Sequence, residues 1–371
     1  MYDQCLIYQI GLTLVKGIGN IIAKQVIDSL GDASLLFTEK AHLLELIPGI
    51  SRKIIAEINN SDVLKRAEKE VRFIEKNKIT PLFITDIDYP QRLKECVDSP
   101  VILYYKGLAN LNTAKIISIV GTRHATMYGK EITAELVRGI AEVFPDTLIV
   151  SGLAYGIDIA AHKAALKEAL PTVGVLAHGL DRIYPSTHRS TAVEMIKEGG
   201  LLTDFLSETE PDRQNFVKRN RIVAGIADCT IVVESASKGG SLITANIADS
   251  YHRDVFAVPG KATDVHSEGC NILIKQKKAA LITCADDIFR EMCWDNSAES
   301  KKEKVVQKNL FIELSKEEQQ IVGLLSKAEN MQLNIIAVEL DFPVNKLAAI
   351  LFELEMKGVI RCMPGGLYGL V

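Results

Sequence analysis

The stretch KIISIVG, residues 115–121, decides the fold of the central part of this chain. It is an apolar, strand-like run, and four runs of the same kind follow it: TLIVSG (147–152), TVGVLAHG (172–179), CTIVVES (229–235) and DVFAVPG (254–260). Helical patterns separate these runs, at 128–143, 156–169, 188–198, 219–227 and 241–251. Strands that alternate with crossover helices pair in parallel, so this order predicts a Rossmann-like, doubly wound α/β domain.

Residues 1–66 have a different pattern, of short helices joined by glycine-centred turns. Two similar segments, VKGIGNIIAKQVID (15–28) and IPGISRKIIAEI (47–58), resemble the helix-hairpin-helix motif, in which glycine lets backbone N–H groups approach a phosphate. A simple interhelical turn explains the same glycines, and equal numbers of acidic and basic residues in 1–66 give no net attraction to DNA. We expect an N-terminal helical (helix-hairpin-helix or SAM-like) domain and leave open whether its turns contact DNA.

The chain divides again at a polar segment. Residues 294–309, WDNSAESKKEKVVQKN, are rich in charge and nearly free of large apolar side chains, so they can contribute little to a core. The sequence after them has a three-helix pattern and then two short β runs around Pro364, Gly365 and Gly366, which is the order of a winged helix. The domains are expected at 1–66, 67–293 and 313–371, with a linker at 294–312.

Composition limits the kind of protein this is. The chain has 371 residues and a formal net charge of −4, so nucleic-acid binding would require a local basic patch. The seven cysteines are scattered and form no CxxC pair, which argues against a disulfide framework or a zinc site. The first residues, MYDQCLIYQI, contain no basic region followed by a long apolar run, so we expect a protein that is not exported, and no apolar run of about 18 residues occurs in the sequence. These features predict a cytoplasmic protein outside the membrane.

Four unusual loops are expected at the carboxyl ends of the parallel strands, where doubly wound sheets bind ligands. Glycine in such a loop permits close approach of the backbone to an anion, and arginine supplies a donor fork that suits phosphate. The loops contain Gly121, Thr122 and Arg123 after the first strand, Ser151 and Gly152 after the second, residues 216–221, and Gly239, Gly240 and Ser241. Together they predict an anion-binding crevice.

The segment FVKRNRIVAG, residues 216–225, supplies most of the expected charge. Lys218, Arg219 and Arg221 fall within four positions, and like charges so close repel one another unless an anion offsets them. A solvated helix end would also explain the run. Alternatively, Asn220, Arg221 or both pair with a buried carboxylate such as Glu234.

Candidate catalytic groups are few. Asp158 and His162 are spaced i and i+4 on an expected helix, which permits an acid/base pair but also an ordinary side-chain hydrogen bond, the interpretation we favour. His178 ends an expected strand and has room to face the crevice. No HExxH or GxSxG motif and no metal-ligand spacing accompanies them, so we expect no catalytic residues and no bound metal.

The motifs VGTRHATMYG, VSGLAYGIDIAAH, HGLDRIYP, NFVKRNRIVAGIADCTIVVES, KGGSLITANIA and DVFAVPG occur in this order over roughly 115–285. Together they resemble the DNA-processing protein A (DprA/Smf) family, and both flanking regions fit the frequent layout of that family. The resemblance implies a bacterial cytosolic protein, without a cofactor or an enzymatic activity. It further implies single-stranded DNA binding, a homodimer formed through the Rossmann-like domain, and loading of the RecA recombinase during natural transformation.

The DNA-binding pocket that this resemblance implies consists of the loop residues already selected. They are Gly121, Thr122, Arg123, Ser151, Gly152, Phe216, Lys218, Arg219, Asn220, Arg221, Gly239, Gly240 and Ser241. The chain departs from the family where it has Thr203-Asp204 for Ser-Glu, Val217 for proline and Lys238-Gly239-Gly240 for Lys-Ser-Gly. The location of the pocket therefore follows from the resemblance more firmly than its shape.

Two further hypotheses concern other activities. The crevice also resembles that of the cytokinin-activating phosphoribohydrolases, which act on nucleotides, but KGGSLITAN lacks the third glycine and the glutamate of their Gly-Gly-x-Gly-Thr-x-x-Glu loop. A winged helix suggests duplex DNA contact through a recognition helix around 343–357. Acidic residues outnumber basic ones in 313–371, and the helix contains Glu353 and Glu355, so we favour a protein-contact or regulatory role.

Overall fold

The computed structural model describes residues 4–294, 314–326, 330–363 and 366–370. The chain forms two compact units, Met1–Asn296 and Ser297–Val371. Except for Trp294, the expected linker at 294–312 lies outside the described residues. Within the described ranges, no helix combines the length and apolar character needed to cross a membrane.

The first unit begins with short helices: α1 (Gln4–Leu14), α2 (Asn20–Leu30), α3 (Leu35–Thr38), α4 (Ala41–Leu44) and α5 (Arg52–Ile58). Their two glycine turns depend on positive backbone angles, with φ of 97° at Gly17 and 89° at Gly49. An added Cβ at Gly17 would lie 3.0 Å from Ile54, and one at Gly49 would lie 3.1 Å from Ile22. Each turn therefore packs against the helix that follows the other turn, and the interhelical packing accounts for both glycines.

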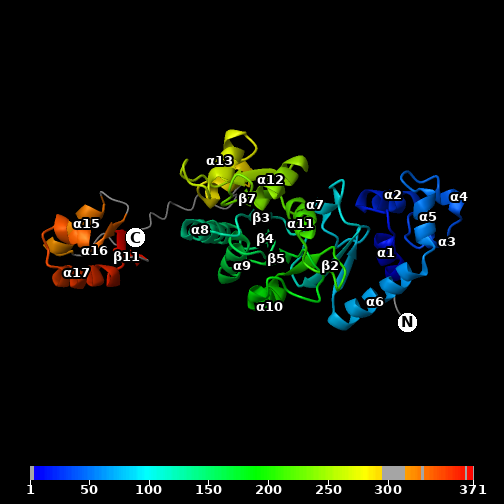
Figure 1. Ribbon diagram of the computed structural model, residues 1–371, viewed down its shortest axis with the longest axis horizontal. Helices are drawn as coiled ribbons and strands as arrows, with labels where there is room; N and C mark the ends of the chain where they lie inside the picture. The colour runs from blue at the N-terminus through cyan, green and yellow to red at the C-terminus, as the bar shows by residue number, and fades with distance from the viewer. Residues whose placement is uncertain (1–3, 295–313, 327–329, 364–365, 371) are drawn as a thin grey trace. The chain divides into compact units, whose positions relative to one another are not determined.

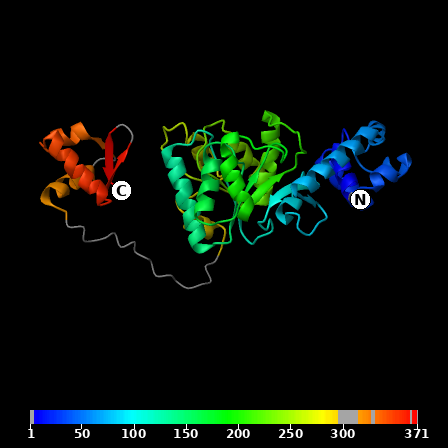
Figure 2. The same cartoon turned by 90° about the horizontal axis from the view of Figure 1, so that it is seen from below.

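Helix α6 (Ser61–Asn77) joins these helices to the sheet (Figures 1 and 2). The side chain of Asn60 caps it by accepting the N–H of Asp62, and Lys78 ends it in a left-handed conformation. Our expected domain boundary after residue 66 falls inside this helix. The helix continues because Ala67, Val71 and Ile74 keep its buried face apolar.

The sheet of the first unit has nine strands: β1 (Thr80–Phe83), β2 (Ile102–Gly107), β3 (Ile116–Val120), β4 (Leu148–Ser151), β5 (Thr172–Val175), β6 (Gly200–Thr203), β7 (Cys229–Val232), β8 (Asp254–Ala257) and β9 (Ala280–Leu281). Their order is β1-β2-β6-β5-β4-β3-β7-β8-β9. The seven neighbouring strands from β6 to β9 pair in parallel, and five of them, β3, β4, β5, β7 and β8, are the strands that the sequence predicts. Strands β1 and β2 add an antiparallel edge, which we did not predict. They pair antiparallel because the connection between them contains only the one-turn helix α7 (Gln91–Lys94), which is too short for a parallel crossover.

Helices cover both faces of this sheet. Alternate residues of β3 point to opposite sides: Ile117 and Ile119 pack with α8 (Met127–Val143) and α9 (Ile157–Lys167), whereas Ile116 and Val120 lie in the core beneath α11 (Arg213–Ile226) and α12 (Gly240–Ser250). The remaining helices of the unit are η1 (Ser186–His188), α10 (Arg189–Glu198), α13 (Glu268–Lys275) and α14 (Ala285–Glu291).

The chain reverses its direction of travel across the sheet at β3. From β3 it proceeds through β4 and β5 to β6, and α11 then returns it to β7, on the other side of β3. The loops after β3 and β7 therefore separate at the carboxyl edge, and this is where open α/β sheets form ligand crevices. The topology confirms the doubly wound fold and fixes where a site should lie.

The second unit is a winged helix, as predicted. It contains α15 (Lys316–Leu325), β10 (Met331–Gln332), α16 (Leu333–Glu339), α17 (Val344–Met356), β11 (Ile360–Met363) and β12 (Leu367–Leu370). The three strands form a small antiparallel sheet in the order β10-β12-β11. Its core is built from Ile321, Leu347, Leu351 and Leu354.

Candidate functional site

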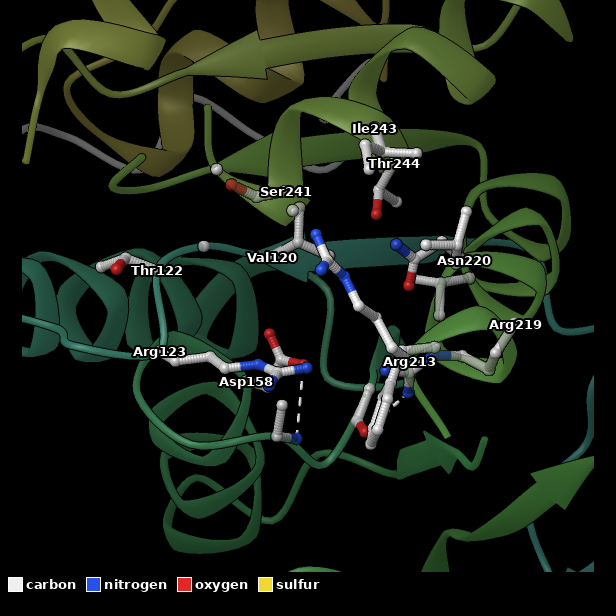
Figure 3. Close-up of a pocket in the computed structure, with 18 of the residues that line it drawn as sticks. Val120, Thr122, Arg123, Asp158, Arg213, Arg219, Asn220, Ser241, Ile243 and Thr244 are labelled. Carbon is white, nitrogen blue, oxygen red and sulfur yellow. Dashed lines mark hydrogen bonds between the residues drawn. The ribbon is translucent and has the colours of Figure 1, made fainter. Parts of the chain in front are cut away.

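A cleft of about 670 Å³ opens at the carboxyl ends of β3 and β4, at the reversal point of the sheet. It lies between the loops after these strands and the amino-terminal parts of α11 and α12 (Figure 3). Ten of the thirteen residues that we selected from the sequence line it: Gly121, Thr122, Arg123, Gly152, Phe216, Arg219, Asn220, Gly239, Gly240 and Ser241.

The loop after β3 is held rigidly by its neighbours. The N–H of Thr122 donates to the carbonyl of Glu234 at 2.7 Å, and the carbonyl of Thr122 accepts the N–H of Ile157 at 3.2 Å. The Glu234 carboxylate accepts the N–H of Thr126 at 2.9 Å and its hydroxyl at 2.5 Å. Glu234 therefore anchors this loop, and it does not pair with Asn220 or Arg221 as one of our alternatives supposed.

Arg123 projects from this loop into the cleft. Its guanidinium carbon lies 4.9 Å from the centroid of the Phe216 ring, a distance at which a cation is attracted to an aromatic face. Its side chain is exposed and makes no ion pair with any described residue. Arg123 and Phe216 thus place a free cation beside a partly exposed ring.

Arg213, which the sequence reasoning missed, adds a second accessible cation. Helix α11 begins at Arg213 rather than 219, because the Asp212 side chain caps it by accepting the N–H of Gln214 at 2.8 Å. Arg213, Phe216 and Asn220 therefore share one helix face, at spacings of three and four residues. Figure 3 shows that the side chains of Arg123, Arg213 and Arg219 extend into the same space from the two sides of the cleft. The capping signal at Asp212 was the sequence feature that would have found Arg213.

Arg219 forms part of the floor and is only 4% exposed. Its Nη1 donates to the carbonyl of Gly152 at 2.6 Å and to the carbonyl of Val175. A Cβ at Gly152 would lie 2.4 Å from that Nη1, so a larger residue there would displace the guanidinium from its present position. Burial lowers the pKa of Arg219 to about 10, which still leaves the guanidinium charged at neutral pH. Arg219 therefore contributes fixed positive charge from below the cleft.

The first turn of α12 supplies amide donors. Gly240 and Ser241 occupy its first two positions, where backbone N–H groups have no partner within a helix. No acceptor in the described part of the chain takes either N–H, while the hydroxyl of Ser241 donates to that of Ser235 at 2.9 Å. An added Cβ at Gly240 would meet nothing within 4 Å, so this corner of the cleft is open to a ligand. Lys238, which precedes the turn, also lines the cleft.

Three of the residues that we selected do not line the cleft. Ser151 is fully buried and donates its hydroxyl to the carbonyl of Ile119 at 2.6 Å. Lys218 is exposed on a different side of α11 from Phe216 and Asn220, because successive helical residues are rotated by about 100°.

Arg221 is an internal residue, so our expectation of one convergent cationic cluster is wrong. Its Nη2 pairs with Asp204 at 2.5 Å, and its Nη1 donates to the carbonyl of Asp98. The pairing with an internal acid that we considered does occur, but Asp204 supplies the carboxylate in place of Glu234. Asp204 is one of the departures from the family pattern, and it keeps an acid where this arginine requires one.

The expected hydrogen bond between Asp158 and His162 is also wrong. His162 is buried and its Nδ1 lies 2.7 Å from the Thr172 hydroxyl, whereas Asp158 accepts the N–H of Ala154 at 3.4 Å. Burial and the nearby Arg219 lower the pKa of His162 to about 3, so it stays neutral. Burial raises the pKa of Asp158, which lies in the cleft.

His178 does not face the crevice. Its Nδ1 lies 2.9 Å from the carbonyl of Gly179, and its Nε2 accepts the N–H of Tyr184 at 3.2 Å. Burial lowers its pKa. Within the described ranges, no group of three or more His, Cys, Asp or Glu side chains is placed to hold a metal ion. The accessible arginines and N–H groups of the cleft are donors that suit an anion.

The fold and the cleft together define a Rossmann-like protein whose site, at the reversal point of the sheet, is lined by arginines, amide groups and the aromatic rings of Phe216 and Tyr184. The family model for DNA recombination-mediator protein A matches residues 80–293, and the model for the DprA winged helix domain matches residues 312–366. The chain belongs to the DNA recombination-mediator protein A (DprA/Smf) family, as its sequence motifs predict.

Several relatives are similar over most of their length. The DNA processing protein DprA of Bacillus subtilis (strain 168) is 41% identical over 215 residues, which cover 58% of this chain and 71% of that protein. The putative DNA processing protein DprA of Mycobacterium tuberculosis (strain H37Rv) is 36% identical over 282 residues, or 74% and 70% of the two chains. Protein Smf of Escherichia coli (strain K12) is 32% identical over 292 residues, or 75% and 74%.

Two solved structures are also similar. The X-ray structure of DNA processing protein A from Streptococcus pneumoniae aligns with a TM-score of 0.65 and 30% identity, covering 78% of this chain and 99% of that one. A structure of DNA processing protein A from Helicobacter pylori, whose subject is a unique single-stranded DNA binding mode, aligns with a TM-score of 0.53 and 29% identity. It covers 59% of this chain and 97% of that one.

Proposed function

We propose that this protein binds single-stranded DNA in the cleft and loads the RecA recombinase onto that strand during natural transformation. The observation that carries the proposal is the convergence of Arg123, Arg213 and the amides of α12 around Phe216. Phosphates require cations and N–H donors, whereas a base requires an aromatic face. The cleft offers both and has no groove-reading element, so binding should be largely independent of base sequence.

The comparisons support the ligand class. The Helicobacter pylori relative of similar fold has a described single-stranded DNA binding mode, and the family is one of recombination mediators. We extend both properties to this chain because the cleft forms from the same loops that carry the family motifs. A homodimer through the Rossmann-like domain would place two clefts on one strand and raise its avidity.

Substitutions in the cleft test the DNA site. Arg123→Ala and Arg213→Ala should each weaken binding of unrelated single strands by a similar factor and reduce the slope of log affinity against log salt concentration by about 0.7 per lost phosphate contact. Lys218→Ala is the matched control, because Lys218 is an exposed cation on the same helix outside the cleft. Fluorescence anisotropy with labelled oligonucleotides at several salt concentrations measures both quantities. Wild-type affinity in both cleft variants, or an equal loss in the control, would contradict the proposal.

The recombinase-loading step needs its own assay. The protein should shorten the lag before RecA hydrolyses ATP on a single strand already covered by single-strand-binding protein. Arg123→Ala should lose this effect in proportion to its loss of DNA affinity. An unchanged lag with the wild-type protein would remove RecA loading from the proposal and leave DNA binding in place.

The nucleotide-processing alternative finds less support in the cleft. The Glu234 carboxylate, just after β7, accepts two hydrogen bonds from Thr126 and does not line the cleft. The acidic residue that lines the cleft is Asp158. Release of a free base from a nucleoside monophosphate by the purified protein, lost on Asp158→Asn, would revive this alternative.

A further inference from the structure

A second cavity, of about 710 Å³, lies beside the cleft. The loop after β3 forms the boundary, since Arg123 lines both spaces. The remaining walls come from the start of α8 and from α9 with the residues just before it. The complete lining is Arg123, His124, Ala125, Lys130, Tyr155, Gly156, Ile159, Ala160 and Lys163. Of the thirteen residues that we selected for the DNA-binding pocket, Arg123 alone belongs to it.

The charge of this second cavity has one sign. Lys130 and Lys163 face it from α8 and α9, Arg123 and His124 face it from the loop, and none of the residues that line it is acidic. The lysines are exposed, and neither forms an ion pair with another described residue. A local excess of cations in a chain of net charge −4 attracts a polyanion to this place.

Tyr155 provides an aromatic surface in the same cavity. Its side chain is 46% exposed, and its ring lies 5.0 Å from that of His188 at 71°, an edge-to-face contact. His188 is fixed in turn, because its Nδ1 lies 2.9 Å from the carbonyl of Leu153. The next residue, Gly156, has φ of 80° and contacts the loop so closely that a Cβ would lie 2.0 Å from the carbonyl of Thr122. The ring is therefore held in place beside the loop with much of its surface free to stack.

We propose that the second cavity binds the nucleotides that follow those in the cleft, so that one single strand crosses the Thr122–Ala125 loop. The inference rests on the proposed function. Lys130 and Lys163 neutralise successive phosphates, one base stacks on Tyr155, and Arg123 contacts the strand where it passes between the two spaces. Phosphate contacts and stacking are independent of base identity, so this subsite lengthens the footprint without adding sequence preference.

The length of the strand provides the test. Labelled oligo(dT) strands of increasing length are titrated against the wild-type protein, the double variant Lys130→Ala/Lys163→Ala and the variant Tyr155→Ala. The shortest strand that binds the wild type fills the cleft alone, and all three proteins should bind it equally. For longer strands, Tyr155→Ala should lose about ten-fold in affinity. The double variant should also lose affinity, and its salt slope should fall by about 1.4. Lys167→Ala, an exposed lysine one turn further along α9, is the control and should match the wild type.

The outcomes separate the two proposals. If both second-cavity variants bind every length as the wild type does while Arg123→Ala binds weakly, the subsite is refuted and DNA binding in the cleft stands. If they lose affinity for short and long strands alike, the cavity acts by shaping the cleft and the subsite is again refuted. If the wild type binds no single strand, the proposed function fails and the subsite fails with it.

Discussion

Arg221 gives the sharpest prediction, because a sequence motif and the structure assign it different roles. We expect Arg221→Met to destabilise the first unit and to leave the DNA affinity of the folded protein within about two-fold of wild type. Arg221 is 9% exposed and is paired with Asp204, whose side chain is 13% exposed. The other carboxylate oxygen of Asp204, Oδ1, has no hydrogen-bond partner in the described part of the chain. Removing the arginine therefore leaves the buried Asp204 carboxylate without its cationic partner.

The magnitude follows from this burial. Breaking one side of a buried ion pair costs about 3–5 kcal/mol, against about 0.5 kcal/mol or less for an exposed cation. Lys218→Met, three residues earlier on the same helix, is the control and should leave the unfolding free energy almost unchanged. In the double variant Arg221→Met/Asp204→Leu, no charge remains buried, so part of the lost stability should return.

Urea unfolding followed by the fluorescence of Trp294 measures the effect. Trp294 is the only tryptophan of the chain, and its ring lies 6.0 Å from that of Phe144 in an edge-to-face contact within the first unit. Its signal therefore reports on the unit that contains Arg221. If Arg221→Met loses less than about 1 kcal/mol of stability, or if the folded variant loses more than ten-fold in DNA affinity, the main role of Arg221 is not to stabilise the fold through its ion pair with Asp204.

Two further results should follow from the structure. Gly129→Ala, in the first turn of α8, should destabilise the protein by about 1–3 kcal/mol and weaken DNA binding, although alanine favours helices. The added Cβ would lie 2.2 Å from Glu234 Oε2 and would displace the carboxylate that anchors the Arg123 loop. A Gly129→Ala variant that is more stable than wild type in the same urea assay would contradict this. The buried His162, with its pKa lowered to about 3, should make the protein lose stability as pH falls from about 6.5 toward 3, since the unfolded state takes up a proton that the folded state excludes. His162 contributes a slope of up to about 1.4 kcal/mol per pH unit, so the slope should become smaller in His162→Gln, while His178, whose pKa burial also lowers, keeps its own contribution. Equal slopes for the two proteins would mean that His162 does not contribute.

The apolar strand runs predicted the parallel part of the sheet because burial on both faces leaves a continuous apolar sequence. β3, β4, β5, β7 and β8 all lie within the runs that we selected. We did not select β1, β2 or β6. The apolar run of β6 is short, because Thr203 and Asp204 follow Leu202 directly, and β1 and β2 pair antiparallel, so no crossover helix separates them in the sequence. Helix α11 begins six residues before our prediction, because its first turns are polar and only the cap at Asp212 marks its start.

The candidate site was predicted in position more accurately than in composition. A loop that follows a parallel strand must reach the carboxyl edge of the sheet, so Gly121, Thr122, Arg123 and Gly152 could be placed there from their order alone. The side chains on α11 could not be placed from their order alone, because each residue of a helix is rotated by about 100° from the one before it. Arg213 and Phe216 therefore face the cleft, while Lys218 is directed elsewhere and Arg221 enters the core.

The sequence by itself thus determined the parallel fold, the winged helix and the edge at which a site forms, since these depend on the period of apolar residues and on the order of strands and loops. Only the tertiary structure decided which cations are available to a ligand. A guanidinium is free or occupied according to the carboxylates and carbonyls that folding brings beside it, and the partners of Arg219 and Arg221, Gly152 and Asp204, lie 67 and 17 residues away along the chain.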